Sequence, residues 1–174
     1  MRTFKLCIWH FRLFILGSVF LCHNNLLASG SPRTRDLTVF VKTVSGTKLA
    51  IAYEAPLKVK QMVYAANQII GKPYKWGGGH RVLHDSGYDC SGAVSYVLSR
   101  TGIIPGSKHC REFLSFGQPG KGRWVTLYVS RTHIFMSLCG RTFDVFVNGK
   151  KTGPRWVPEG RSTKGFQARR IPGM

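Results

Sequence analysis

The spacing of apolar residues changes along the chain from a helical pattern to a strand pattern, and this change restricts the possible folds. Residues 57–70 place apolar side chains every three or four positions, which predicts an amphipathic helix that ends at Gly71. Helices are also predicted over residues 90–100 and 110–116, whereas strand patterns follow Pro119. Helices followed by strands predict an α+β fold in which the helices pack on a central antiparallel β-sheet.

Three strands are predicted in the second half of the chain. They cover residues 123–130, 132–139 and 142–147, which contain alternating and β-branched side chains. Gly140 lies between two of these segments and predicts a tight hairpin turn. Residues 148–174 are basic and interrupted by glycine and proline, so we expect this tail to wrap over the surface.

The N-terminal region has the pattern of an export signal. Basic residues precede an apolar run at residues 13–22, and small residues follow at 28–30. This order predicts a signal peptide over residues 1–30, with an uncleaved anchor as the alternative. We expect residues 31–56 to form a hairpin extension and residues 57–174 to form the main domain with its basic tail. An exported chain would be secreted, periplasmic or held at the cell envelope.

The charge of the chain is strongly positive. There are 26 Lys and Arg residues against 7 Asp and Glu residues, which gives a net charge of +19. Such a surface attracts polyanions, and anionic cell-envelope polymers are the partners we expect, with a merely solvated basic surface as the alternative. Nucleic acid is not expected, because export is predicted and the sequence contains no recognisable nucleic-acid motif. We expect a monomer.

The cysteines limit the covalent chemistry of the chain. Cleavage near Gly30 would leave Cys90, Cys110 and Cys139, an odd number, so at least one thiol would stay free or pair between chains. A disulfide between Cys110 and Cys139 would leave Cys90 free. The cysteines and histidines lack Cys-x-x-Cys and His-x-x-x-His spacing, so we expect no metal site and no cofactor.

Cys90 is the candidate nucleophile. It follows Asp89, which occupies the N-cap position of the second predicted helix. The free N–H groups and the positive end of the helix dipole favour a thiolate at this position, and the thiolate is the nucleophilic form. The alternative is a buried structural cysteine.

A base and an orienting group are predicted on neighbouring strands. His133 stands at the start of a strand, where its ring could take the Cys90 proton, although histidines in the glycine-rich loop and beside Cys110 are alternatives. Asp144 lies on the next strand and could hold the imidazole. It could equally be an ordinary acid near a turn.

Three short stretches carry a resemblance to a known family. Residues 73–78 (PYKWGG), 89–92 (DCSG) and 132–134 (THI) are similar to motifs of the NlpC/P60 cell-wall endopeptidases. This resemblance implies a papain-like fold. It also implies that the Cys90 thiolate attacks an amide bond of a peptidoglycan stem peptide, with His133 as base and later as acid.

The resemblance also assigns substrate-binding residues and shows two departures. It implies substrate binding by Tyr74, Trp76, Asp89 and Ser91. The family often carries His, Asn or Gln in the third catalytic position, where this chain has Asp144. The usual Gly-Asp turn before the histidine strand is also missing, which indicates a divergent member.

Three functions remain open from the sequence. The first is a secreted cysteine endopeptidase that hydrolyses peptidoglycan stem peptides. The second is a non-catalytic cationic module that binds the cell wall, which the positive charge would support. The third is an acyl or amide transferase with the same Cys–His chemistry, because an acyl-enzyme can pass its acyl group to an amine instead of water.

Overall fold

The computed structural model describes residues 39–42, 48–51, 55–157 and 161–174. The predicted signal peptide lies outside these residues. In the N-terminal extension, β1 (Val39–Lys42) and β2 (Lys48–Ile51) pair antiparallel, which confirms the predicted hairpin. Within the described part of the chain, no helix is long and apolar enough to cross a membrane.

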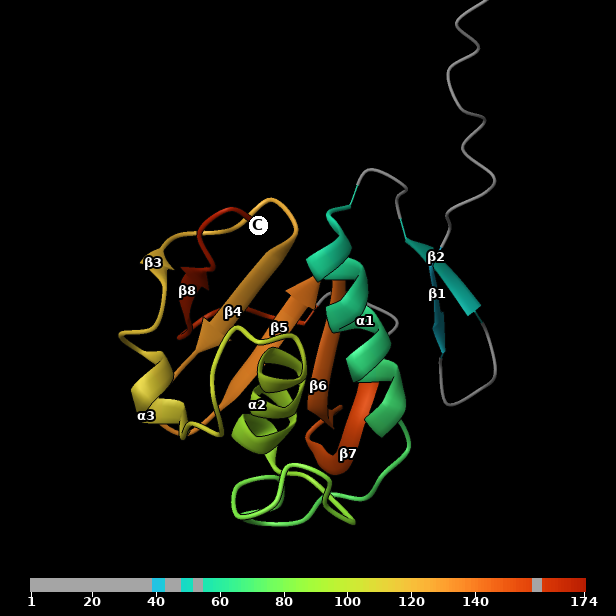
Figure 1. Cartoon of the computed structure of the whole chain (residues 1–174). Coiled ribbons are helices and arrows are strands. Elements are labelled where there is room, and N and C mark those ends of the chain that lie inside the picture. Colours follow the sequence, from blue (N-terminus) through green and yellow to red (C-terminus); the bar gives the residue numbers. More distant parts are fainter. Residues whose placement is uncertain (1–38, 43–47, 52–54, 158–160) are drawn as a thin grey trace, which may run out of the picture. The chain divides into compact units, whose positions relative to one another are not determined.

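A six-stranded sheet forms the centre of the domain, in the order β3-β8-β4-β5-β6-β7 (Figure 1). Every neighbouring pair in it is antiparallel. The strands are β3 (Gln118–Pro119), β4 (Val125–Val129), β5 (Ile134–Leu138), β6 (Arg141–Val147), β7 (Lys150–Val157) and β8 (Gln167–Arg170). The three predicted strands therefore correspond to β4, β5 and β6, which run consecutively through the sheet.

Two helices cover one face of this sheet. Figure 1 shows α1 (Leu57–Ile69) and α2 (Cys90–Arg100) in front of β5, β6 and β7. The short α3 (Cys110–Phe113) lies on the side of α2 away from α1. Gly71 follows α1 with φ +86°, a left-handed conformation that glycine adopts without strain and that ends the helix. This arrangement confirms the α+β class, with helices packed on an antiparallel sheet.

The core lies between the two helices and the sheet. It contains fully buried side chains from α1 (Val59, Met62, Val63, Ala66), α2 (Val94, Val97, Leu98) and the sheet (Leu127, Met136, Phe143). Burying one large aliphatic or aromatic side chain contributes about 1.5–3 kcal/mol, so this layer fixes α2 firmly against β5 and β6. The site residues at the ends of these elements are therefore held by the core.

The prediction that residues 148–174 wrap over the surface is wrong, because this tail supplies two strands of the sheet. β7 pairs with β6, and β8 lies between β3 and β4. Gly153 and Pro154 interrupt the alternation that would reveal β7. Gly153 has φ +79°, and an added Cβ would lie 2.0 Å from the Lys72 carbonyl oxygen, so the strand packs closely against the loop after α1.

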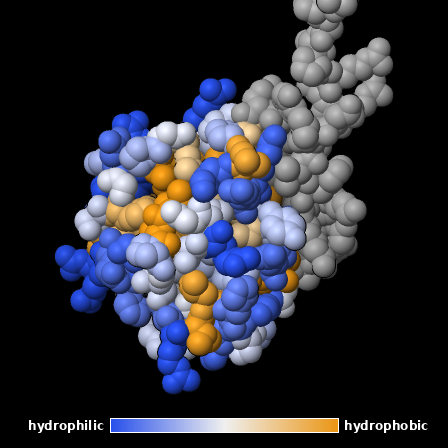
Figure 2. Space-filling view, in the orientation of Figure 1, coloured by the Kyte–Doolittle hydropathy of each residue, from blue (hydrophilic) through white to orange (hydrophobic). Residues whose placement is uncertain are grey.

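Polar side chains dominate the molecular surface on the side where α1 and α2 lie. Figure 2 shows this face with hydrophilic residues spread across it and hydrophobic residues in small groups between them.

Candidate active site

Cys90 is the first residue of α2, and Asp89 caps this helix. The Asp89 backbone is extended, and its Oδ1 accepts a hydrogen bond from the Gly92 N–H at 2.7 Å, as predicted from the sequence. A cap of this kind stabilises a helix by about 1 kcal/mol. It also fixes the first turn, so that the Cys90 sulfur lies at the positive end of the helix dipole.

The glycine-rich loop passes directly over the start of α2. Gly77 N–H donates to Asp89 Oδ2 at 3.0 Å, which ties the loop to the helix cap. A Cβ added at Gly92 would lie only 1.9 Å from the Gly78 carbonyl oxygen. The glycines therefore permit a backbone contact that no other residue type would allow, and this contact sets the position of Cys90.

His133 and Asp144 form the pair that the sequence predicts. His133 precedes β5, Asp144 lies in β6, and His133 Nε2 is 2.9 Å from Asp144 Oδ1. Ser130 helps to hold the histidine, because its hydroxyl accepts from the His133 N–H and donates to the His133 carbonyl. Since Nε2 faces the carboxylate, Nδ1 is the ring nitrogen left for the Cys90 sulfur.

The Asp144 side chain is completely buried and has several partners. Its Oδ1 accepts from the backbone N–H groups of Val145 at 2.7 Å and Phe146 at 3.1 Å, where the register between β6 and β7 shifts. Its Oδ2 lies 3.0 Å from Arg161 Nε. The N–H is not aligned for a hydrogen bond, so this contact is an ion pair. These groups compensate the negative charge in the interior.

The surroundings of His133 favour its charged form. Burial lowers its pKa, but the hydrogen bond to Asp144 and the interaction with Cys90 outweigh burial and raise the pKa to about 9. The ring is bounded by Phe146 in an edge contact, with ring centroids 5.0 Å apart. An imidazolium held in this way can stabilise a neighbouring thiolate and later donate its proton.

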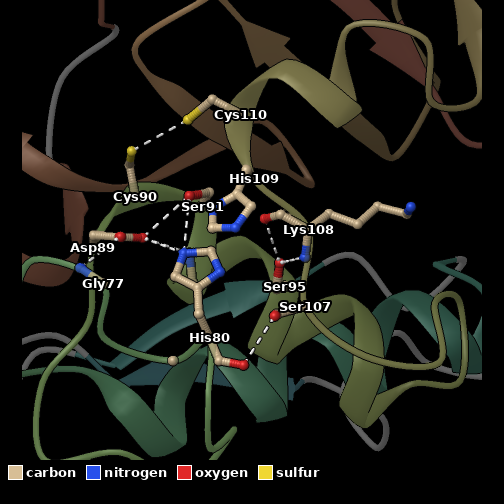
Figure 3. Close-up of polar contacts among 12 residues, drawn as sticks. Gly77, His80, Asp89, Cys90, Ser91, Ser95, Ser107, Lys108, His109 and Cys110 are labelled. Carbon is tan, nitrogen blue, oxygen red and sulfur yellow. Dashed lines mark hydrogen bonds and ion pairs between the residues drawn. The ribbon is translucent and has the colours of Figure 1, made fainter.

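Cys110 lies beside Cys90, which the sequence does not reveal. The two sulfur atoms are 3.6 Å apart (Figure 3). The disulfide between Cys110 and Cys139 that the sequence allows is not formed. The Cys110 sulfur faces Cys90 instead, and all three thiols are free. Cys110 begins α3, and only the tertiary packing of α3 beside α2 brings the two thiols together.

The thiol pair changes the expected acidity of Cys90. The contact with Cys110, followed by burial, raises the pKa of Cys90, and His133 opposes this rise. The same contact lowers the pKa of Cys110. The helix start alone predicts a readily ionised Cys90, and the neighbouring Cys110 thiol is the main reason that its pKa is raised instead.

A cleft of about 920 Å³ gives access to these groups. Six predicted site residues line it: Tyr74, Trp76, Asp89, Cys90, Ser91 and His133. The seventh, Asp144, is buried behind His133. Trp76 is 83% exposed at the rim, where its indole is available to a ligand. Burial, followed by the charges of Cys90 and Asp89, raises the pKa of Tyr74, so its hydroxyl stays protonated and can donate a hydrogen bond.

His80 is a further residue that the sequence does not single out for this site. Its Nε2 is 3.0 Å from Asp89 Oδ1 and 3.2 Å from the Ser91 hydroxyl, and its ring stacks on His109 with centroids 4.4 Å apart (Figure 3). Burial raises the pKa of Asp89, but its hydrogen bonds from His80 and Gly92 lower it overall. Asp89 is therefore an anion whose oxygens are already engaged within the protein.

Among the described residues, no group of three or more His, Cys, Asp or Glu side chains is arranged to hold a metal ion. The cleft offers the thiols of Cys90 and Cys110 and the imidazole of His133, with the carboxylate of Asp144 behind it. Such a set is suited to nucleophilic attack on a carbonyl carbon, followed by proton transfer to the leaving group.

Sequence comparison relates the chain to enzymes of known type. Over 72 residues it is 46% identical to the probable peptidoglycan endopeptidase LytE of Bacillus subtilis, a match that covers 40% of this chain and 20% of LytE. Over 95 residues it is 30% identical to the peptidoglycan endopeptidase RipB of Mycobacterium tuberculosis, covering 41% of this chain and 39% of RipB. The chain is therefore similar to these peptidoglycan endopeptidases over about two fifths of its length. It spans well under half the length of these two relatives, and no family model matches it.

Two solved structures align with this one over part of its length. The peptidoglycan hydrolase RipB of Mycobacterium tuberculosis aligns with a TM-score of 0.49 at 20% identity, covering 66% of this chain and 64% of RipB. An NLP/P60-family protein similar to a lipoprotein, from Staphylococcus aureus, aligns with a TM-score of 0.47 at 19% identity, covering 72% and 45%. The resemblance of the sequence to peptidoglycan endopeptidases is confirmed by the two relatives found through sequence.

Proposed function

We propose that the chain is an exported cysteine endopeptidase that hydrolyses amide bonds in peptidoglycan stem peptides. One observation carries this proposal. Cys90 stands at a helix start in an open cleft, within interaction range of His133, whose other ring nitrogen is 2.9 Å from the buried Asp144 carboxylate. The names of the relatives supply the substrate class, since RipB is named a peptidoglycan endopeptidase and LytE a probable one.

In the acylation half of the reaction, the Cys90 thiolate, paired with the His133 imidazolium, attacks the amide carbon. The oxyanion of the tetrahedral intermediate would accept a hydrogen bond from the backbone N–H of Cys90, which is free at the helix start. His133 then donates its proton to the leaving nitrogen, and the carbon–nitrogen bond breaks. The product at this stage is a thioester on Cys90 and a released amine.

In the deacylation half, His133 removes a proton from water, and the hydroxide attacks the thioester. The carbon–sulfur bond breaks, the carboxylic acid leaves, and the proton stays on His133, which restores the thiolate–imidazolium pair. Asp144 holds the ring in one tautomer throughout, because its carboxylate accepts from Nε2. The backbone N–H groups and Arg161 keep that carboxylate in place.

The walls of the cleft supply candidate substrate contacts. We assign substrate binding to Tyr74, Trp76 and Ser91, with Asp89 in a dual role as helix cap and cleft wall. The positive charge would hold the protein near anionic cell-envelope polymers, where its substrate lies. The same charge favours the cell-wall-binding module as the second candidate function, and that module would bind without turnover.

Digestion of muropeptides in water enriched in oxygen-18 tests the reaction class. The full chain should produce a new free amine and a new carboxylate that contains one heavy oxygen, as detected by mass spectrometry. A parallel digest with an added amine acceptor tests transfer. Salt-sensitive wall binding without any cleavage would contradict the proposal in favour of the binding module, and an acyl product without heavy oxygen would contradict it in favour of a transferase.

A further inference from the structure

Two thiols in the cleft are close enough to react with each other. Cys90 begins α2 and Cys110 begins α3, and their sulfur atoms are 3.6 Å apart. A disulfide bond is about 2.05 Å long, so the sulfurs would have to approach by about 1.5 Å. This gap is shorter than the distance that a sulfur atom moves between staggered rotamers. Side-chain rotation can therefore close most of it.

Hydrogen bonds hold the segment before Cys110 in this position. The Lys108 N–H donates to the Ser95 hydroxyl at 2.9 Å, and that hydroxyl donates to the Lys108 carbonyl at 3.2 Å, which ties the segment to α2. The Ser107 hydroxyl donates a hydrogen bond to the His80 carbonyl at 3.0 Å. Figure 3 shows these contacts beside the two cysteines, which extend toward one another from α2 and α3. The proximity of the thiols is thus built into the fold.

The third described cysteine differs from this pair. Burial raises the pKa of Cys139 to about 11, despite an opposing effect of Lys60, so this thiol carries little thiolate near neutral pH. Cys90 and Cys110 both line the cleft, which a small reagent can enter, and within the pair the pKa of Cys110 is lowered. An oxidising reagent should therefore select the pair over Cys139.

We infer that Cys90 and Cys110 form a reversible disulfide with each other when the protein meets a low-molecular-weight disulfide such as oxidised glutathione. The Cys110 thiolate attacks one sulfur of the reagent, the reagent's sulfur–sulfur bond breaks, and one thiolate leaves. The Cys90 thiolate then attacks the Cys110 sulfur and expels the second reagent thiolate. Two electrons pass to the reagent, which becomes two thiols by taking the two protons of the cysteines.

The functional consequence rests on the proposed function. A sulfur held in a disulfide cannot attack an amide, so the oxidised protein would be inactive and a thiol reductant would restore it. Exported proteins meet oxidising surroundings more often than cytosolic ones do. The pair would then keep the endopeptidase inactive until a reductant is present.

The test measures the covalent bond itself, so its outcome does not depend on hydrolysis. The full chain is incubated with graded ratios of oxidised to reduced glutathione, quenched by alkylation, and mapped by peptide mass spectrometry. We expect a peptide pair linked through Cys90 and Cys110, together with the loss of two hydrogens. The control variant Cys139→Ser should give the same linked pair at the same ratio.

Replacement of one thiol separates the proposal from simple reagent adducts. In Cys110→Ser, and in Cys110→Ala as a second variant, the reagent should remain attached to Cys90 as a mixed disulfide. The inference is overturned if wild type accumulates stable mixed disulfides without a Cys90–Cys110 link, or if the linked partner is Cys139. A disulfide that forms in a protein without hydrolytic activity would support the pair and contradict only the proposed function.

Discussion

At the scale of single residues, the buried Asp144 charge determines how His133 behaves. Its carboxylate is fully buried, yet it accepts two backbone N–H groups and the imidazole, and pairs with Arg161. The consequence is an imidazole that is protonated over much of the physiological pH range.

Replacement of this carboxylate by an amide should reduce activity and lower the pKa of the histidine. For Asp144→Asn we expect kcat/KM on muropeptides to fall by roughly 10²–10⁴-fold, because the ring loses the partner that fixes its tautomer. NMR titration should show the His133 pKa falling from about 9 toward its ordinary value. The matched variant Glu112→Gln, in the exposed part of α3, should leave the His133 pKa unchanged. An unshifted His133 pKa in Asp144→Asn would contradict this role.

Removal of the neighbouring thiol should make Cys90 more acidic. The contact with Cys110 is the largest cause of the raised Cys90 pKa, so Cys110→Ala should lower it. Iodoacetamide should then alkylate Cys90 faster at neutral pH, by about threefold for each unit of pKa, since the thiolate fraction rises more than its nucleophilicity falls. Peptide mapping assigns the modified residue. Slower or equal alkylation relative to Cys139→Ala would refute this effect.

At the scale of secondary-structure elements, the glycine-rich loop and the start of α2 form one unit. The Gly78 carbonyl lies where a Gly92 side chain would be, and Asp89 joins the loop and helix by hydrogen bonds. Alanine favours a helix interior over glycine by up to about 1 kcal/mol, so propensity alone would predict that Gly92→Ala is stabilising. The clash with the Gly78 carbonyl outweighs this preference, so the substitution should destabilise the protein.

We expect Gly92→Ala to lower the free energy of unfolding by about 1–3 kcal/mol, because the clash is with backbone atoms that cannot rotate away. Urea unfolding measures the change. Gly106→Ala is the matched control, since a Cβ there meets nothing within 4 Å and its φ is not positive. If Gly92→Ala is as stable as Gly106→Ala, the close packing of loop and helix is not as described.

Sequence reasoning succeeds where an element has a strong periodic pattern. The predicted helix over residues 57–70 and α1 differ by one residue. The strands β4 and β5 lie within their predicted ranges, and β6 begins one residue before its predicted range. β8 has the sequence QARR, which shows no apolar alternation. Its backbone pairing with β4 is what holds it in the sheet. A pattern of side chains cannot reveal a strand that is placed by its backbone.

The candidate site likewise contains some residues that the sequence could predict and others that it could not. Cys90, His133 and Asp144 could be predicted because a helix cap and adjacent strands restrict their positions. Cys110 and Arg161 could not, since each reaches the site only through tertiary packing: α3 turns back onto α2, and the tail returns to β6. A tail that wrapped over the surface, as predicted, would not place Arg161 beside Asp144.

At the scale of the whole molecule, the raised His133 pKa links stability to pH. A group whose pKa is higher in the folded state contributes stability below its unfolded value of 6.5, and this contribution is lost as the pH rises through about 9. We therefore expect the free energy of unfolding to fall by up to about 3 kcal/mol over this interval, at 1.36 kcal/mol per unit of pKa.

Urea unfolding of wild type and Asp144→Asn across the same interval measures this effect. The decrease should be smaller in the variant, because its histidine pKa is closer to the unfolded value, whereas the cysteine contributions are common to both proteins. Equal pH dependence in the two proteins would show that the His133–Asp144 contact does not stabilise the folded state.

The central claim is that the Cys90 sulfur performs the chemistry. Hydrolysis of muropeptides by the full chain should be abolished in Cys90→Ala and retained in Cys139→Ala, with both variants equally folded by circular dichroism. Cleavage by Cys90→Ala at the wild-type rate would contradict the assignment of Cys90 as the nucleophile.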